Sequence, residues 1–314
     1  MKPDFIVICG PTASGKTALA VALAQALNGE VVSADSMQVY RRMDIGTAKP
    51  TAEEMAGVPH HMIDVADPEE NYSVARYVQE AVPVVDDILA RGRLPIVAGG
   101  TGLYIDNLIA GREFAPFPAD TGLRESLQAR AKAGGLPALR EELARVDPEA
   151  ARRLHPNDEK RIIRALEVWY ATGKTITEHD RESRALPPRY TALTIGLDYA
   201  DRADLRERID RRVDEMMDRG LEAEVRALLD SGVSPGCTAM QAIGYKELAA
   251  ALAEGRPAEE GAEEIKLRSR QYAKRQLTWF RRNRDVRWFR WGSSPDFSQA
   301  LAFSTETAAR CGLQ

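Results

Sequence analysis

The sequence predicts an α/β fold in which a parallel sheet carries helices on both faces and an all-helical domain is inserted. Three observations lead to this class. In the first third of the chain, short apolar runs alternate with helical patterns, which is typical of parallel strands joined by helices. From residue 121 to about residue 184 the pattern is helical, without a strand signal. Prolines border that segment, and an apolar run and a long helix follow it, so the sheet is expected to resume.

The expected elements of the first third follow one another in a regular order. Strands are predicted at 5–9, 30–33 and 94–98, and helices after the first strand and over most of 68–91, despite Pro83. Residues 5–9 form a continuous apolar run, as in a strand buried on both faces. Ligands of such sheets bind beyond the carboxyl ends of the strands. Asp35 and Thr101, which follow the second and third strands, are therefore expected on one rim with the loop after the first strand.

The loop after the first strand fits the phosphate-binding pattern Gly, four residues, Gly-Lys-Ser/Thr. Its residues are Gly10, Pro11, Thr12, Ala13, Ser14, Gly15, Lys16 and Thr17. Leu19, Leu23 and Leu27 continue at helical spacing, so backbone N–H groups and the positive end of a helix are expected to meet a phosphate chain. Lys16 is placed to reach phosphate oxygens, and Thr17 to offer its hydroxyl to Mg²⁺. The alternative is a chance match in an ordinary strand-turn-helix, and the motif does not say whose phosphate binds.

The rest of the chain divides into an insertion and the end of the core. The predicted domains are 1–115, the first part of a P-loop NTPase-like α/β core; 116–188, the helical insertion; and 189–314, which completes the core with a basic C-terminal helix. Prolines within 114–118 and at 187–188 mark the borders. After the second border, a strand is expected over 190–197 and a long helix over 205–221, weakened near its end by Gly220.

Residues 266–284 form a basic segment without an acidic residue. Its cations are Lys266, Arg268, Arg270, Lys274, Arg275, Arg281, Arg282 and Arg284, and Tyr272, Trp279 and Phe280 are interleaved. A cationic helix with aromatics suits a nucleic-acid backbone and exposed bases. The alternative is a solvated helix whose aromatics belong to the core, and Leu277 and Phe280 are assigned to the core in either case. A second basic cluster, Lys160, Arg161 and Arg164, begins a helix after an expected cap at 156–158.

Composition narrows the class of protein. The 314 residues are 44% hydrophobic and 29% charged, an ordinary soluble balance, and no apolar run approaches the length of a membrane span. The first strand begins so early that no signal peptide is expected. Three scattered cysteines predict reduced thiols and a cytoplasmic protein, and His60 and His61 are expected to form hydrogen bonds rather than bind a metal. Because the net charge is −4, binding to nucleic acid needs a local basic face.

Seven stretches, spread from the first strand to about Trp288, form an ordered set. They read Gly-Pro-Thr-Ala-Ser-Gly-Lys-Thr at 10–17, Ser-Ala-Asp-Ser-Met-Gln-Val-Tyr at 33–40, Met-Asp-Ile-Gly-Thr-Ala-Lys-Pro at 43–50, Gly-Gly-Thr-Gly-Leu-Tyr at 99–104, Asn-Asp-Glu-Lys-Arg-Ile-Ile-Arg-Ala-Leu-Glu at 157–167, Gln-Ala-Ile-Gly-Tyr-Lys at 241–246 and Arg-Gln-Tyr-Ala-Lys-Arg-Gln-Leu-Thr-Trp-Phe at 270–280. In this set the chain resembles the bacterial tRNA dimethylallyltransferases, also called tRNA isopentenyltransferases. Each stretch is moderately specific, and the ordered set is highly specific.

The resemblance implies a prenyl transfer assisted by Mg²⁺. The dimethylallyl group of dimethylallyl diphosphate moves to the exocyclic amine of the adenosine just 3′ of the anticodon, and the phosphate loop holds the donor's diphosphate rather than ATP. It also implies that Asp35 accepts the amine's proton, that Thr101 assists by a hydrogen bond and that Arg212 binds the diphosphate. The alternatives to these roles are a Mg²⁺ ligand or a helix cap for Asp35, and a cap at the glycine turn for Thr101. Spacing alone does not show whether Arg212 or Arg208 lies at the diphosphate. It also does not show whether such an arginine reaches the rim of the site or is solvated.

The resemblance also implies how the acceptor is held. The residues expected to contact tRNA are Asp35, Ser36, Met37, Gln38, Arg124, Glu159, Lys160, Arg161, Ile162, Ile163, Gln241, Ala242, Ile243, Gly244, Tyr245, Lys246, Lys274 and Arg275. The helical insertion and the cationic helix are expected to grip the anticodon stem-loop of tRNAs that read codons beginning with U, and a monomer is expected.

Three other functions are weighed against this one. A small-molecule kinase shares the loop and fold, but gives the cationic helix no role. An adenylate isopentenyltransferase prenylates a free nucleotide, and the insertion and basic segment favour tRNA over it. A non-catalytic RNA-binding module needs neither the phosphate loop nor an aspartate at a strand end.

Overall fold

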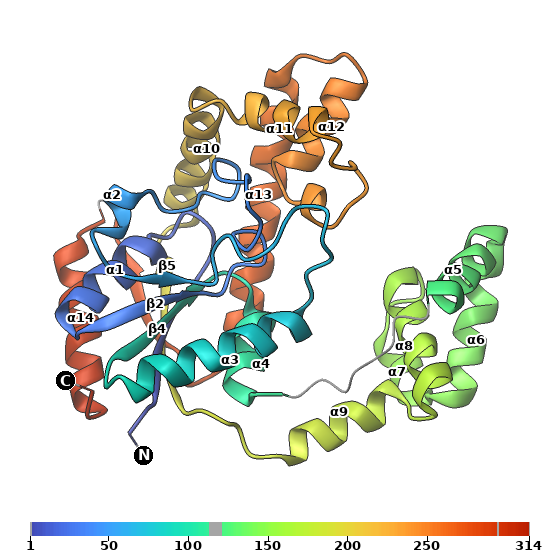
Figure 1. The fold of residues 1–314 in the computed structure, drawn as a ribbon, viewed down its shortest axis with the longest axis horizontal. Coiled ribbons are helices and arrows are strands. Elements are labelled where there is room, and N and C mark those ends of the chain that lie inside the picture. Colours follow the sequence, from blue (N-terminus) through green and yellow to red (C-terminus); the bar gives the residue numbers. More distant parts are fainter. Residues whose placement is uncertain (1, 113–120, 294, 314) are drawn as a thin grey trace. The chain divides into compact units, whose positions relative to one another are not determined.

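The computed structural model describes residues 2–112, 121–293 and 295–313 and divides the chain into two compact units (Figure 1). The first consists of Met1–Gly111 with Arg189–Gln314, and the second is Arg112–Pro188. The prolines expected to mark the first border, within 114–118, lie outside the described residues. Each unit has a hydrophobic core of its own.

The first unit is built on a six-stranded sheet with the order β3-β2-β4-β1-β5-β6. Its strands are β1 (Phe5–Cys9), β2 (Gly29–Ser33), β3 (His60–His61), β4 (Leu94–Gly99), β5 (Ala192–Tyr199) and β6 (Arg287–Trp291). Every neighbouring pair is parallel, so the strands end at one edge of the sheet. The predicted α/β fold class is confirmed. The edge strands β3 and β6 were not predicted, because one is two residues long and the other is interrupted by exposed arginines.

Helices cover both faces of this sheet, since successive side chains of a strand point to opposite faces. On β1, Phe5 and Val7 belong to one core cluster, with side chains of α3 (Val74–Ala90) and α4 (Gly102–Ala110). Ile6 and Ile8 belong to the other, with side chains of α1 (Lys16–Ala26) and α14 (Phe297–Arg310). Figure 1 shows α3 beside α4 and α1 beside α14.

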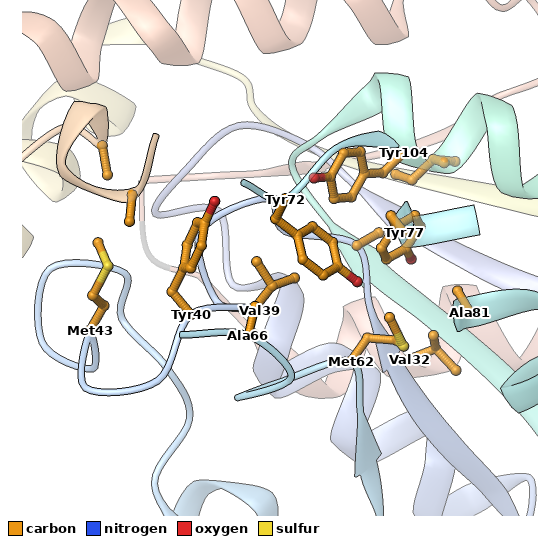
Figure 2. Close-up of a cluster of buried hydrophobic side chains, with 14 of the residues drawn as sticks. Val32, Val39, Tyr40, Met43, Met62, Ala66, Tyr72, Tyr77, Ala81 and Tyr104 are labelled. Carbon is orange, nitrogen blue, oxygen red and sulfur yellow. The ribbon is translucent and has the colours of Figure 1, made fainter. Parts of the chain in front are cut away.

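A group of tyrosines supports the end of β2 (Figure 2). The rings of Tyr77 and Tyr104 stack with centroids 4.2 Å apart, and Tyr40 and Tyr72 meet edge to face at 6.4 Å. The Tyr77 hydroxyl donates to the carbonyl oxygen of Ser33 at 3.0 Å. Tyr72 is buried in this core, and α3 begins two residues later at Val74, capped by Ser73, so most of 68–91 is helical, as predicted. The cluster thereby fixes the backbone that leads to Asp35.

The C-terminal half of the first unit is helical between β5 and β6. Its helices are α10 (Arg202–Asp218), α11 (Leu221–Asp230), the 3₁₀ turn Ala239–Gln241, α12 (Tyr245–Ala253) and α13 (Ala258–Phe280), and the short α2 (Ala52–Met55) lies earlier in the chain. The helix predicted over 205–221 is two helices, because Gly220 has φ 94° and precedes a new N-terminus. Leu277 and Phe280 are buried, as predicted.

All regular secondary structure in the described residues of the second unit is helical. Its helices are α5 (Thr121–Arg130), the π-helical connection Ala131–Gly135, α6 (Leu136–Val146), α7 (Pro148–Arg153), α8 (Glu159–Thr172) and α9 (Ile176–Ala185). Leu127, Leu139 and Leu166 are among the side chains of its core. Asp158 caps α8 by accepting from the N–H of Arg161, as expected from the sequence.

Candidate functional site

The phosphate loop Gly10–Thr17 connects β1 to α1 at the carboxyl edge of the sheet. Gly10 has φ 148°, and a Cβ there would lie 2.4 Å from the carbonyl oxygen of Leu197, so β5 leaves no room for a side chain. Gly15 has φ 83° and directly precedes the first turn of α1. The first N–H groups of a helix have no partner within it. The loop therefore leads directly into the positive end of α1, whose first N–H groups favour an anion.

Lys16 faces the loop that it follows. Its Nζ donates to the carbonyl oxygen of Pro11 at 2.7 Å. Burial, and then the nearby charge of Arg212, lower the pKa of Lys16 from 10.5 to about 8. The loop lines a cavity of about 400 Å³ together with Arg208, Arg211 and Arg212 of α10. Such a concentration of positive charge in a partly buried site favours a multiply charged anion.

The structure distinguishes Arg212 from Arg208. Arg212 lines both this cavity and an adjoining one of about 300 Å³, whereas Arg208 lines the first alone. The guanidinium of Arg208 lies 5.9 Å from the ring centre of Tyr199. Burial lowers the pKa of Arg212, and the nearby carboxylate of Asp35 opposes that shift. Arg212 is thus the arginine that faces the middle of the site.

Asp35 and Thr101 meet because β2 and β4 are neighbours in the sheet. A Cβ on Gly99 would lie 2.2 Å from the carbonyl oxygen of Ala34, so glycine permits the two strand ends to touch. Thr101 Oγ1 accepts from the N–H of Ser36 at 3.1 Å and donates to Ser36 Oγ at 3.3 Å. Thr101 occupies the N-cap position of α4, but its side chain bonds to the Asp35 loop and not to the helix.

The second cavity differs in character from the first. Its apolar lining is made by Met37, Ile209, Val213, Met216, Ala242, Ile243 and Ile265. The two cavities share Thr12, Asp35, Thr47, Arg212, Met216 and Tyr272. Asp35 Oδ1 accepts from the N–H of Met37 at 2.9 Å, which holds the carboxylate at this junction. The site thus joins a cationic cavity to an apolar one, with a carboxylate and an arginine between them.

Two residues of α13 belong to the site although sequence reasoning did not place them there. Tyr272 lines both cavities, and Gln276, one turn later, lines the first. Burial and the charge of Asp35 raise the pKa of Tyr272 to about 12. The sequence feature that could have predicted them is their spacing of four residues, which places both on one face of a helix. The many cations of the same segment hide it.

The C-terminal segment also supports the phosphate loop. Trp291 Nε1, at the end of β6, donates to the carbonyl oxygen of Ser14 at 2.9 Å. Phe297, at the start of α14, lines the first cavity, and its ring would lie 3.1 Å from a Cβ on Gly15. Sequence reasoning missed both residues because it predicted neither element.

The segments of the first unit that were expected to contact tRNA surround these cavities. Ser36, Met37, Gln241, Ala242 and Ile243 line the second cavity, and Gln38 lines the first. Gln38 Nε2 donates to the carbonyl oxygens of Thr47 and Ala48, at 3.3 and 3.2 Å.

The end of the 241–246 segment divides into buried and exposed residues. Gly244 and Tyr245 are buried, and the Tyr245 hydroxyl donates to Glu224 Oε1 at 2.5 Å. The Tyr245 side chain therefore packs inside the unit, while Lys246 is exposed.

The basic segment 266–284 is only partly available to a partner. Lys266 pairs with Asp214, Arg270 with Asp210 and Arg281 with Asp198, at 2.6 to 2.7 Å, and Arg268 pairs with Glu264 at 3.2 Å. Lys274 and Arg275 are exposed, and neither forms an ion pair with another described residue. Arg282 and Arg284 are exposed as well and also form no ion pair with another described residue, so the eight cations of this segment divide into four that pair with carboxylates and four that do not.

In the second unit, the residues expected to contact tRNA differ in exposure. Arg124 and Arg164 hold the buried carboxylate of Glu167, at 2.8 and 2.9 Å. Ile162 and Ile163 belong to the core of the unit. At the start of α8, Lys160 and Arg161 are exposed and Glu159 is half-buried, and Arg161 pairs with Asp158 at 2.6 Å.

Two further findings concern binding of a metal and of a membrane. His61 Nε2 bonds to Glu30 Oε2 at 2.8 Å and His60 Nδ1 to the carbonyl oxygen of Val58 at 2.8 Å, so the histidine pair forms hydrogen bonds as predicted. Among the described residues, no group of three or more His, Cys, Asp or Glu is arranged to hold a metal ion. None of the described helices is both long and apolar enough to cross a membrane.

Fold and site define an α/β protein in which a Gly-x-x-x-x-Gly-Lys-Thr loop at the carboxyl edge of a parallel sheet lines a cationic cavity beside an apolar one. The IPP transferase family model matches residues 38–283. The tRNA dimethylallyltransferases of Desulforudis audaxviator and of Caldanaerobacter subterraneus subsp. tengcongensis are 51% and 49% identical to this chain, over 287 and 290 residues; the alignments cover 91% and 92% of this chain and the same shares of those proteins.

Solved structures agree with this assignment. The full-length tRNA isopentenylpyrophosphate transferase of Bacillus halodurans is 43% identical, with a TM-score of 0.73, over 99% of this chain and 98% of that one. A eukaryotic dimethylallyltransferase acting on tRNA is 31% identical, with a TM-score of 0.79, over 98% of this chain and 79% of that one. The chain belongs to the IPP transferase family, that of the tRNA dimethylallyltransferases, which confirms the resemblance seen in the sequence.

Proposed function

We propose that this chain transfers the dimethylallyl group of dimethylallyl diphosphate to N6 of the adenosine at position 37, 3′-adjacent to the anticodon, in tRNAs that read codons beginning with U. Family membership supports the reaction class. The observation that carries the proposal is the junction of the two cavities at Asp35 and Arg212. It offers a place for an anionic donor, a place for a flat acceptor and a proton acceptor between them.

The donor's diphosphate is assigned to the first cavity. The loop residues from Ala13 to Thr17 supply backbone N–H groups, and Lys16, Arg208 and Arg212 supply positive charge. Preorganised donors of this kind stabilise charge that develops on a leaving group. The dimethylallyl chain extends toward the shared wall, where Met216 offers an apolar surface.

Mg²⁺ is assigned to the same cavity as a resident cofactor. Thr17 offers a hydroxyl oxygen to this lining, a hard oxygen donor of the kind that Mg²⁺ prefers. The residues present therefore fit the ion, with Thr17 as its protein ligand. Bound there, Mg²⁺ neutralises part of the charge on a diphosphate.

The proposed reaction exchanges one bond for another. The bond between C1 of the dimethylallyl group and the diphosphate oxygen breaks, and the leaving diphosphate keeps the electron pair. The bond between C1 and N6 of adenine forms, and the carboxylate of Asp35 accepts the N6 proton, with Thr101 holding the Asp35 loop through Ser36. The amine is a weak nucleophile because its lone pair is delocalised into the ring, so a positioned general base is needed.

The acceptor base is assigned to the second cavity. A base inside a stacked anticodon loop cannot reach the sheet edge, so it has to leave the stack. Met37, Ile209 and Ile243 offer apolar contacts to such a base, and Gln241 offers an amide at the wall of the same cavity. Lys274, Arg275 and Lys246 in the first unit are proposed to contact the RNA backbone.

The second unit is proposed to bind the stem-loop as well. Arg124, Lys160 and Arg161 are the exposed or half-exposed cations from which that contact is expected. We propose that the enzyme acts as a monomer in the cytoplasm.

The test is transfer of radiolabelled dimethylallyl diphosphate in the presence of Mg²⁺ to three acceptors. These are an anticodon stem-loop with adenosine 3′ of the anticodon, the same loop with guanosine there, and free AMP. Label is expected in the adenosine loop alone. Label in AMP would assign the chain to free-nucleotide prenylation. Absence of label, together with consumption of ATP, would favour a kinase.

A further inference from the structure

Gln276 joins two loops that bind different parts of the reaction. Its Oε1 accepts from the N–H of Thr12 at 2.8 Å, and its Nε2 donates to the carbonyl oxygen of Gly100 at 3.0 Å. Thr12 belongs to the phosphate loop, and Gly100 directly precedes Thr101. A carboxamide is suited to this bridge because it carries an acceptor at one end and donors at the other.

The packing around Gln276 fits a dedicated contact. The side chain is 5% exposed, and a Cβ on Gly100 would lie 2.1 Å from its Nε2. One turn further along α13, Trp279 lies against Gly102 in the same way, with a carbon 2.2 Å from the place of a Cβ. Glycines at 100 and 102 thus let α13 press directly on the turn that carries Thr101.

The two bridged loops leave neighbouring strands. Cys9 of β1 is paired with Gly99 of β4, so the chain segments that follow them start side by side and then diverge. From Gly100 the connection continues through Thr101 to the N–H of Ser36, and so to the Asp35 loop. Through these hydrogen bonds, Gln276 connects the loop assigned to the diphosphate with the loop that carries the proposed proton acceptor.

We propose that Gln276 is a positioning residue that sets the separation between the diphosphate and the acceptor base. This inference rests on the proposed function. Rate depends steeply on such a separation, because a displacement of about 1 Å costs on the order of 10²-fold. A buried amide with both ends bonded holds its partners in one arrangement, whereas an apolar side chain of the same length does not.

The test compares Gln276→Met, Gln276→Glu and the control Gln271→Met. Methionine has a similar length but forms neither bond. Gln271 lies on the same helix and is exposed, so its substitution tests the loss of an amide from α13 away from the site. For each variant, kcat, KM for dimethylallyl diphosphate, KM for the stem-loop and the melting temperature are measured. We expect Gln276→Met to lower kcat about 10- to 100-fold, with both KM values within about threefold of wild type.

For Gln276→Glu the pH dependence of kcat is measured as well, because a purely structural role of Gln276 would not alter it. A protonated carboxyl has one donor and one acceptor, as the amide has, whereas a carboxylate only accepts. The charged and titratable side chains that line the same cavity, Lys16, Asp35, Lys49, Glu54, Arg208, Arg211, Arg212, Glu215, Arg219 and Tyr272, are present in the wild type too, so the ratio of the two enzymes removes their effect. The ratio of variant to wild-type kcat is therefore expected to rise as pH falls for Gln276→Glu, and to stay constant for Gln276→Met.

The outcomes separate this inference from the proposed function. If the wild type transfers no label, the proposed function fails. If the wild type transfers label and Gln276→Met keeps its kcat, or loses activity only through KM or melting temperature, the positioning role is wrong. A kcat ratio that is independent of pH for Gln276→Glu would also contradict it.

Discussion

At the scale of single residues, the site is defined by charges held in unusual surroundings. Lys16, Arg212 and Asp35 line one cavity, and each changes the electrostatic environment of the others. Two of them, Lys16 and Arg212, are cations whose pKa values are lowered by burial. Keeping their charges in a buried site costs free energy as long as no anion is bound there. A bound diphosphate would favour the charged form of both side chains. Binding of the donor and protonation of Lys16 are therefore linked.

The affinity for the donor is expected to depend on pH through Lys16. The pKa of this side chain is lowered to about 8, so it is mainly protonated at pH 7 and mainly neutral at pH 9. Because the protonated form attracts the diphosphate, the dissociation constant of dimethylallyl diphosphate should be nearly constant up to about pH 7.5 and should rise above pH 8. Isothermal titration calorimetry without tRNA, from pH 7 to 9.5, measures it.

Lys16→Arg is the matched control, because arginine stays charged throughout this range. Its dissociation constant should show no rise above pH 8, whatever its absolute value. Identical pH profiles for wild type and Lys16→Arg would remove Lys16 as the titrating group.

Asp35→Ala is expected to bind both substrates and to lose turnover. A positioned general base contributes about 10²- to 10⁴-fold in rate, and the single-turnover rate of label transfer should fall by that amount. Donor affinity by calorimetry and stem-loop affinity by gel shift should remain within about threefold. Full turnover in the variant would exclude Asp35 from the chemistry, and loss of donor binding would favour the alternative of a Mg²⁺ ligand.

At the scale of elements, the loops of the site are held by side chains from distant helices. Glu224 of α11 accepts from the N–H groups of Asp44, Ile45 and Gly46, at 2.9 to 3.2 Å. On the inner side of the same loop, Lys49 Nζ donates to Asp44 Oδ1 at 2.7 Å. The stretch at 43–50 has no chemistry of its own in the proposed reaction. It positions Thr47 and Ala48, whose carbonyl oxygens accept hydrogen bonds from the side chain of Gln38.

Helix α13 has two faces with different tasks. Tyr272 and Gln276 enter the site, whereas Lys274 lies between them in sequence and is exposed. The charge reversal Lys274→Glu should therefore weaken stem-loop binding, by a factor of about 5 to 50 at low salt, and leave donor affinity almost unchanged. Gel shift at two salt concentrations and calorimetry with the donor measure the two effects.

Arg310→Glu on α14 is the control for a reversed surface charge. Its side chain is exposed and pairs only with Glu306 among the described residues, at 3.2 Å. Equal losses of stem-loop affinity in the two variants would mean that net charge, and not the place of Lys274, governs binding.

At the scale of the whole molecule, most of the fold was predictable because its signals are local. The phosphate loop is a contiguous motif, and Asp35 and Thr101 follow apolar strands, so parallel order alone places them on one edge. Strand β6 was not predictable from apolar pattern, since an edge strand with exposed arginines resembles a loop. The bridge formed by Gln276 depends on the packing of residues far apart in sequence, which no local pattern reveals.

The division of the chain into two units bears on which adenosine of the tRNA is modified. The donor cavity lies within the first unit, and cations assigned to the RNA occur in both. If the account is right, the chain should modify one adenosine of a complete tRNA and leave every other adenosine unchanged. The most direct measurement is to incubate the protein with unmodified full-length tRNAs, dimethylallyl diphosphate and Mg²⁺, and to map the product by nuclease digestion and mass spectrometry. We expect a single dimethylallyl group on N6 of the adenosine 3′ of the anticodon, in tRNAs that read codons beginning with U. A prenyl group on adenosines elsewhere, or release of diphosphate without any modified tRNA, would contradict the account.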